Sequence, residues 1–314
     1  MKKVVNDVRL MIKVCDLYYN QNVSQQQIAT LLDISRPTVS RLIASAREQG
    51  IVKILVMDMD TIKYWDLERK LKELYHLQDV VIADSHPTKE GTKDALGYSA
   101  ARYLEHRIKA GDVVGVSMGS TLHRVVSQMT NPSTEDVTFV PLIGGMGQLR
   151  MELHSNSLTE TLSRVYQGRC VPLHAPARVS NAMIRDELMK EESLASAIRL
   201  EECLDIAIVG IGYPNEDSSI MATGYLKDNE VESLIERKVA GEICMQFYDI
   251  TGDTAPYYDD NNVIGIELKK LRKVPCSIGI AGGIEKLPAI QGAIRGQYIN
   301  ILITDYQCAK ALVE

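Results

Sequence analysis

The sequence has few cysteines, and none of them stands at a spacing typical of a metal site. The six thiols are scattered along the 314 residues, at Cys15, Cys170, Cys203, Cys244, Cys276 and Cys308. No CxxC pair and no His/Cys cluster occurs, so reduced thiols are expected rather than zinc or disulfides. The chain also lacks a run of about 18 apolar residues, so no membrane-spanning helix is expected. No metal or other cofactor is predicted.

Export signals and nucleotide-binding motifs are missing as well. The first residues, MKKVVNDVRL, become charged too early for a signal peptide, so the cytoplasm is the expected location. No GxxxxGK[ST] loop occurs, which argues against a P-loop nucleotide site. No GxGxxG opens a helix with an acidic residue about twenty positions later, which disfavours a dinucleotide.

The net charge of −6 is unevenly divided along the chain. Residues 1–56 contain eight Lys/Arg and four Asp/Glu, a net charge of +4, so the remainder carries −10. A small basic head on an acidic body indicates a polyanion-binding module joined to a domain with another task.

The basic head has the pattern of a helix-turn-helix. Apolar spacing predicts a first helix within residues 7–20. Ser24 and Gln27 form a capping-box pair at the start of a second helix, and Ser35 is a capping residue for a third. The apolar stripe of the second helix is predicted on Ile28, Leu31 and Leu32. The segment 51–56, IVKILV, is predicted as a strand of a small wing.

The third helix is predicted to have one buried face and one face toward DNA. The predicted inward residues are Val39, Leu42, Ile43 and Ala46. The predicted contacts with operator DNA are Ser35, Arg36, Pro37, Thr38, Ser40 and Arg41, because such a helix lies in the major groove. Arg36 and Arg41 suit either guanine edges or phosphates. The alternative is a three-helix packing unit with a solvated polar face.

The rest of the chain alternates between helices and apolar strands. Residues 57–64 are the predicted linker, and 65–314 the predicted effector and oligomerisation domain, which opens on an amphipathic helix at 65–76. Strands are predicted at 80–84, 112–117, 137–143, 170–175, 205–212, 242–249, 277–283 and 300–305. Helices are predicted at 92–109, 120–129, 153–166, twice between 180 and 201, at 229–238, at 286–295 and at the end. This alternation predicts an α/β, Rossmann-like, mostly parallel sheet covered on both faces.

Four glycine-containing loops follow predicted strands, where ligands bind in parallel sheets. They are SMGST (117–121), GGMG (144–147), GIG (210–212) and GGIEK (282–286). Glycine with Ser or Thr at the start of a helix exposes N–H groups and hydroxyls to an anion. Each loop alone is equally consistent with a tight turn. Four at one edge of a sheet favour a phosphorylated metabolite.

Seven segments spread over nearly the whole chain carry a family resemblance. They are YYNQNVSQQQIATLLDISRPTVSRLI, GDVVGVSMGSTL, FVPLIGGMG, IAIVGIG, VAGEICMQFYD, IGIAGGIEKLPAIQGAI and YINILITD. In them the chain resembles the SorC family of sugar-responsive bacterial transcriptional regulators. The resemblance implies a body similar in fold to sugar-phosphate isomerases and deaminases. It also implies a homo-oligomer, a dimer or tetramer, whose operator affinity is changed by a sugar phosphate.

The resemblance further implies a set of effector-binding residues. The phosphate loop falls on Ser117, Gly119, Ser120 and Thr121, and the second glycine loop on Gly144 and Gly145. Polar residues of the following helix fall on His154 and Asn156, the acidic ligand of sugar hydroxyls on Glu242, and the phosphate-pairing lysine on Lys286. Some relatives have Lys or Arg directly before the paired glycines; Ile143 stands there, so no Schiff base is expected at that position.

Two other classes of protein compete with a regulator. A sugar-phosphate isomerase or deaminase would use Glu242 as its general base, but an acid in a sugar pocket more often accepts hydroxyl hydrogen bonds. A purely architectural DNA-binding protein would not need four glycine loops at a sheet edge. The expected partners are therefore operator DNA, a sugar-phosphate effector and further copies of the chain, with no membrane and no catalytic residue.

Overall fold

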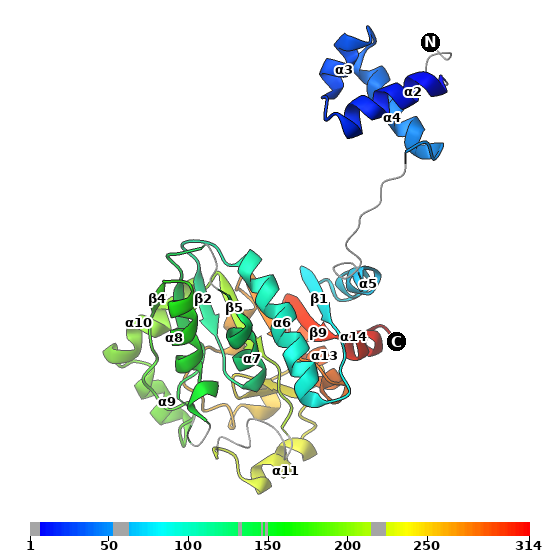
Figure 1. Ribbon diagram of the computed structural model, residues 1–314. Coiled ribbons are helices and arrows are strands. Elements are labelled where there is room, and N and C mark those ends of the chain that lie inside the picture. Colours follow the sequence, from blue (N-terminus) through cyan, green and yellow to red (C-terminus); the bar gives the residue numbers. More distant parts are fainter. Residues whose placement is uncertain (1–6, 53–62, 131–133, 146, 148–149, 215–223) are drawn as a thin grey trace. The chain divides into compact units, whose positions relative to one another are not determined.

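The chain divides into two units, residues 1–63 and 64–314 (Figure 1). The computed structural model describes residues 7–52, 63–130, 134–145, 147, 150–214 and 224–314. Most of the predicted linker 57–64 falls outside these residues. No helix in the described part of the chain combines the length and apolarity that crossing a bilayer requires.

The head consists of three short helices around one apolar core. They are α2 (Val8–Cys15), which continues as the π-helical turn η1 (Asp16–Asn20), α3 (Gln25–Leu31) and α4 (Arg36–Glu48). Both predicted N-caps are present: Ser24 and Gln27 form the capping box, and the Ser35 hydroxyl accepts from the Thr38 N–H at 3.3 Å. The core residues are Met11, Val14, Cys15, Leu17, Ile28, Ala29, Val39, Leu42, Ile43 and Ala46.

Two predictions for the head are corrected. Leu31 is 64% exposed, so its place in the apolar stripe of the second helix is wrong. Ala29 is buried beside Ile28, and at 100° per residue Leu31 lies about 110° from the middle of the face that these two define. Ile51 and Val52 form a bend rather than the start of a wing strand, and 53–56 lie outside the described residues.

The body is built on a seven-stranded parallel sheet, which confirms the α/β prediction. Its strands are β1 (Asp79–Ala83), β2 (Val113–Val116), β3 (Thr138–Pro141), β4 (Arg169–Cys170), β5 (Ile206–Gly210), β8 (Cys276–Ile280) and β9 (Ile301–Asp305). The order across the sheet is β1-β9-β8-β5-β2-β3-β4. The central strands are buried on both faces, as expected of parallel strands between helical layers.

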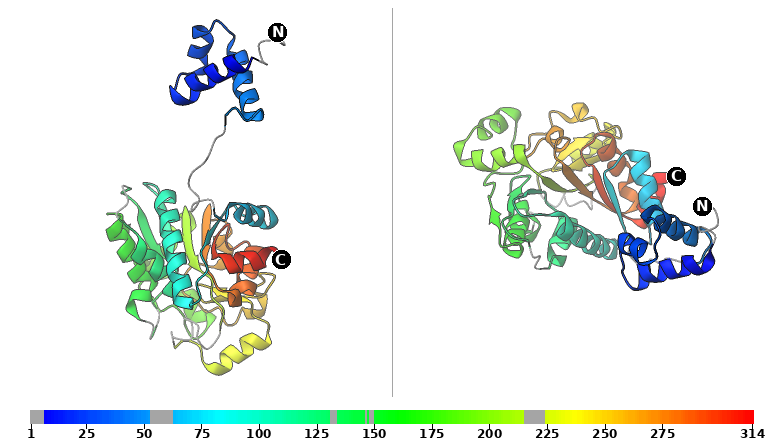
Figure 2. Two further views of the ribbon diagram at one scale, coloured as in Figure 1. Left: turned by 45° about the vertical axis from the view of Figure 1, so that its right-hand side comes forward. Right: turned by 90° about the horizontal axis from the view of Figure 1, so that it is seen from above.

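Helices cover both faces of this sheet. Their bounds are α5 (Trp65–Tyr75), α6 (Lys89–Arg107), α7 (Ser120–Gln128), α8 (Ser155–Val165), α9 (Ala182–Leu188), α10 (Glu192–Leu200), α11 (Asp228–Glu236), α12 (Leu268–Leu271), α13 (Leu287–Arg295) and α14 (Tyr306–Val313). Short 3₁₀ turns are η2 (Met151–Leu153), η3 (Glu201–Cys203), η5 (Ala255–Tyr257) and η6 (Ile284–Lys286). Helices α6, α7 and α8 share one apolar cluster, whereas α5, α10, α13 and α14 share the other (Figure 2).

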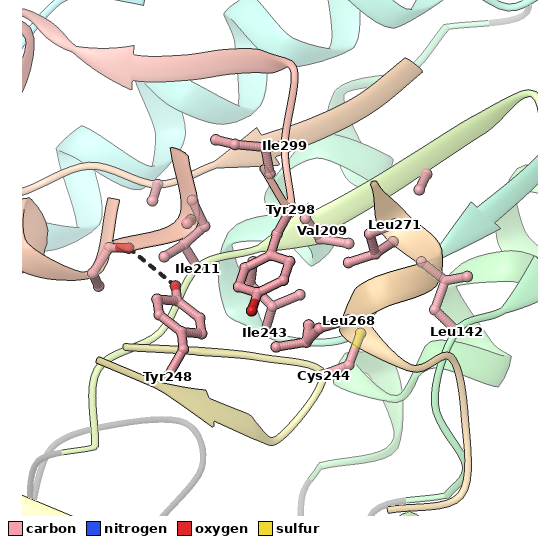
Figure 3. Packing of buried hydrophobic residues seen from close by; sticks show 14 of the residues in the cluster. Leu142, Val209, Ile211, Ile243, Cys244, Tyr248, Leu268, Leu271, Tyr298 and Ile299 are labelled. Atoms are coloured by element: carbon pink, nitrogen blue, oxygen red, sulfur yellow. Dashed lines mark hydrogen bonds between the residues drawn. The ribbon is translucent and has the colours of Figure 1, made fainter. Parts of the chain in front are cut away.

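The predicted strand 242–249 is wrong. This segment folds into an antiparallel hairpin outside the main sheet, made of β6 (Gly241–Ile243) and β7 (Gln246–Tyr248). The chain reverses because Cys244 and Met245 both adopt left-handed backbone conformations, with φ of 52° and 59°, as a two-residue hairpin turn requires. Tyr248 packs near Tyr298 above the sheet, and its hydroxyl donates to the Ala289 carbonyl at 3.0 Å (Figure 3).

A buried carboxylate lies at the end of α10. Glu201 is 3% exposed, and neither of its carboxylate oxygens has a hydrogen-bond partner among the described residues. The Lys270 ammonium lies 3.5 Å away and is shared with Glu202. Burial therefore dominates and raises the pKa of Glu201 to about 7.

Glu201→Gln should flatten the dependence of stability on pH. A carboxyl whose pKa is raised on folding binds its proton more tightly in the native state, so its stabilising contribution is lost as pH rises from about 4.5 to 7. We expect the free energy of unfolding, measured with urea, to change little in the variant at pH 5. At pH 8 it should be higher than that of the wild type by up to about 3 kcal/mol. The control is Glu202→Gln, an exposed neighbour on the same lysine. An identical pH profile for wild type and Glu201→Gln would contradict this account.

Candidate functional site

A cavity of about 300 Å³ opens at the carboxyl ends of the central strands. Its wall combines the segments that follow β1, β2, β5, β8 and β9 with the tip of the hairpin; they include 85–89, 117–121, 210–213, 282–286, Asp305, Glu242 and Cys244. The strand order places β8, β5 and β2 side by side, so loops from distant parts of the chain meet at one edge. Of the predicted effector residues, the structure brings together Ser117, Gly119, Ser120, Thr121, Glu242 and Lys286.

The N-terminus of α7 faces this cavity without a side-chain cap. Gly119 occupies the N-cap position at φ 117°, a conformation that favours glycine, and no side chain in the described part of the chain caps the first turn. The Gly119 N–H itself donates to the Leu153 carbonyl at 3.0 Å, which fixes the loop. Ser120 and Thr121 then line the cavity at the positive end of the helix dipole. This arrangement is suited to an anion.

Glu242 supplies a buried carboxyl at the cavity wall. Its backbone exchanges two hydrogen bonds with Gly212, at 3.0 and 2.9 Å, which fixes the hairpin to the end of β5. One carboxyl oxygen accepts from the Met245 N–H at 2.9 Å. The side chain is 8% exposed, and burial raises its pKa to about 7. Near neutral pH this group can therefore either donate a hydrogen bond or accept one.

Lys286 supplies a half-buried ammonium from the end of η6. Its Nζ donates to the Ile211 carbonyl at 3.0 Å, which directs the side chain across the end of β5. Burial lowers the pKa of Lys286, and attraction to the Glu242 carboxylate partly opposes this shift. The cavity thus places the ammonium of Lys286 and the carboxyl of Glu242 opposite an uncapped helix start.

Four predicted residues lie outside the cavity wall: Gly144, Gly145, His154 and Asn156. The two glycines pass close to other backbone, with Gly144 N–H bonded to the Ile264 carbonyl and Gly145 N–H to the Ala175 carbonyl. The Asn156 amide bonds both backbone groups of Leu173. His154 stands directly before α8. Their part in effector binding stays a prediction.

The segment after β1 contributes residues that the sequence did not indicate. Ser85, His86, Thr88, Thr92 and Lys93 line the cavity, together with Asp305 and Gln307 after β9. Both strands were predicted, and their carboxyl ends belong to the same sheet edge. Neither loop carries a glycine, at residues 83–90 or 304–308, so the signal that marked the other loops is missing from both.

The head presents the predicted polar face on α4. Ser35, Arg36, Pro37, Ser40 and Arg41 are exposed, whereas Val39, Leu42, Ile43 and Ala46 are buried, as predicted. Thr38 is half-buried, with its hydroxyl 2.7 Å from that of Ser35. The first two turns of the helix therefore present two guanidinium groups and several hydroxyl groups outside the apolar core. Such groups can hold phosphates or read base edges.

A family model, curated proteins and solved structures were all found to be similar to this chain. Residues 43–314 match the family model described as "Putative sugar-binding domain". The chain is 35% identical to the sorbitol operon regulator of Klebsiella pneumoniae, over 98% of this chain and 99% of that protein. It is 33% identical to the deoxyribonucleoside regulator of Bacillus subtilis (strain 168), over 97% of each. The crystal structure of the full-length Klebsiella regulator SorC superimposes with a TM-score of 0.75, covering 98% of this chain and 99% of that one.

Proposed function

The chain belongs to the SorC family of sugar-binding transcriptional regulators, and on this basis we propose that it binds operator DNA through α4 under the control of a phosphorylated sugar. The observation that carries the proposal is the meeting of Ser120, Lys286 and Glu242 in one cavity. These groups come from three segments that are far apart in sequence, and each matches a different part of a sugar phosphate.

The phosphate is assigned to the start of α7. The free N–H groups of the first turn and the hydroxyls of Ser120 and Thr121 donate to its oxygens, and the helix dipole favours its charge. Lys286 supplies the opposing charge. Glu242 then binds sugar hydroxyls, because a buried carboxyl must pair with polar groups of the ligand once water is displaced.

Operator DNA is assigned to the exposed face of α4. Arg36 and Arg41 carry the charge there, and Ser35, Pro37, Thr38 and Ser40 complete the surface. One such helix reads only a short half-site, so useful specificity needs a symmetric pair of heads. The working form is therefore a homo-oligomer, a dimer or tetramer, joined through the residue 64–314 unit.

A thermal-shift screen tests the effector assignment. The panel consists of pentose, hexose and hexitol phosphates, each beside its unphosphorylated counterpart. A true ligand at 100 times its Kd should stabilise the folded protein by about 2.7 kcal/mol. Stabilisation by the unphosphorylated compounds alone would contradict a phosphate anchor at α7.

Gly212→Ala should weaken binding of the sugar phosphate by about tenfold or more. A Cβ on Gly212 would occupy the position of the Glu242 carboxyl, which must then move and lose its bonds to the ligand. Hydrogen bonds to charged groups are worth about 1.5–3 kcal/mol. Isothermal titration measures the effect. The control is Gly210→Ala, where the added Cβ makes an ordinary contact at 3.6 Å with the Met118 carbonyl. Wild-type affinity in Gly212→Ala would refute the role given to Glu242.

Glu242 also favours a second candidate function. A carboxyl with a pKa of about 7 is suited to general acid–base catalysis near neutral pH, as in a sugar-phosphate isomerase or deaminase. The named relatives are regulators. Turnover of sugar phosphates by the purified protein, abolished by Glu242→Gln, would establish the enzyme instead.

A further inference from the structure

The carboxylate of Asp305 holds three segments of the cavity wall together. Asp305 ends β9, is 2% exposed and lines the cavity. Its Oδ1 accepts from the Ser85 hydroxyl at 2.6 Å and from the Gln307 N–H at 3.0 Å. Its Oδ2 accepts from the Gly283 N–H at 2.7 Å. The Ser85 hydroxyl oxygen in turn accepts from the Gln307 N–H at 2.8 Å. The loops after β1 and β8 and the start of α14 therefore share one buried anchor.

One of these segments carries Lys286. Gly283, at φ 100°, stands at the start of η6, and its carbonyl accepts from the Lys286 N–H at 3.0 Å. Asp305 thereby fixes the beginning of the turn that places Lys286 in the cavity. Any shift of this turn on binding a phosphate acts directly on the bonds that Asp305 makes.

The chain neighbours of Ser85 and Asp305 hold Tyr64. Asp84 accepts a hydrogen bond from the Tyr64 hydroxyl at 2.5 Å. Tyr306 stacks on the Tyr64 ring, with centroids 5.0 Å apart and planes at 24°. Ser85 and Asp305 line the cavity, whereas their neighbours Asp84 and Tyr306 contact Tyr64.

Tyr64 is the first residue of the unit 64–314 and directly precedes α5. Its carbonyl accepts from the N–H groups of Leu67 and Glu68, both at 2.9 Å. The unit 64–314 therefore begins at a residue that is held by contacts beside the wall of the cavity.

We propose that Asp305, Ser85, Asp84, Tyr306 and Tyr64 form a relay that links occupation of the cavity to the attachment of the head. A ligand that shifts the loops bound to Asp305 changes how Asp84 and Tyr306 hold Tyr64. Coupling of this kind is reciprocal and typically changes affinities about 5- to 150-fold. The inference rests on the proposed function for its two ends, a sugar phosphate and DNA, whereas the relay itself lies within one unit.

Amide hydrogen exchange in the full-length protein, without ligand or operator, tests the relay. Ser85→Ala removes one hydroxyl from the Asp305 anchor, and Asp305→Asn weakens all of its bonds. The readout is exchange at Leu67 and Glu68, whose N–H groups bond the Tyr64 carbonyl. We expect either variant to weaken the packing of Tyr64 by about the free energy of one hydrogen bond. Both N–H groups should then exchange about two- to tenfold faster. The control is Thr88→Ala in the same loop, which removes the cap of α6 and makes no bond to Asp305.

The reverse experiment starts at Tyr64. Tyr64→Phe deletes the bond to Asp84 outside the cavity and should speed exchange of the Gly283 N–H, which bonds Asp305 inside it. The control is Tyr75→Phe, which deletes an equivalent hydroxyl bond from α5, to the Leu312 carbonyl. Unchanged exchange in the relay variants, or an equal change in the controls, overturns the relay and leaves the proposed function standing. If no sugar phosphate changes the operator affinity of the wild-type protein, the proposed function is wrong, whereas the exchange result still stands.

Discussion

Replacing Leu42 by alanine should lower the free energy of unfolding of the head by about 2–5 kcal/mol. Leu42 is fully buried on α4, and the cavity left by its side chain would lie between the three helices of a small core. Small units have little stability to lose, so part of the head should be unfolded at 37 °C in this variant. Urea unfolding followed by circular dichroism measures the change.

The matched variant is Arg41→Ala, one position earlier on the same helix. Arg41 is exposed, and its Nε donates to the Pro37 carbonyl of the same helix at 3.3 Å. Its loss should leave unfolding nearly unchanged and weaken operator binding by about 1–3 kcal/mol if it reads a base. Similar destabilisation by both substitutions would reject the division of α4 into a buried face and a DNA face.

Lys286→Ala should abolish the response of operator binding to the effector while leaving binding in the absence of effector unchanged. Lys286 extends from η6 into the cavity, and the proposed phosphate loses the charge that this side chain directs across the end of β5. A response of about 5- to 150-fold should fall to about onefold. Fluorescence anisotropy with labelled operator measures both quantities.

Two further variants make this result interpretable. Lys286→Met keeps the packing of the methylene chain and should behave like Lys286→Ala. Lys310→Ala removes an exposed lysine of α14, which pairs with Glu314, and this variant should respond as wild type does. A full effector response in Lys286→Met would show that the effector binds elsewhere. Loss of operator binding in the absence of effector would show that Lys286 is needed for the structure of the protein.

The features that follow from local spacing could be predicted from the sequence. The inward set on α4 follows from helical periodicity, and the caps at Ser24 and Ser35 from side chains that bond within three residues. The parallel sheet follows from the alternation of strands and helices. Its topology then brings Ser120 and Lys286 to one edge, because the carboxyl ends of parallel strands share that edge.

The remaining features depend on contacts between distant residues, which no local sequence pattern predicts. The hairpin after β6 turns on Cys244 and Met245, which carry none of the usual signals of a left-handed turn. The need for glycine at position 212 appears only once the Glu242 carboxyl is in place. Asp305 reaches Ser85 across 220 positions, so the anchor of the cavity wall is a product of the complete fold.

Operator binding measured with a sugar phosphate, and again with the same sugar lacking the phosphate, tests the central claim most directly. The account predicts that the phosphorylated compound shifts the operator Kd by about 5- to 150-fold and that the unphosphorylated one leaves it unchanged at the same concentration. Equal shifts with both compounds, or no shift with a sugar phosphate that stabilises the protein, would contradict control of DNA binding through the cavity at α7.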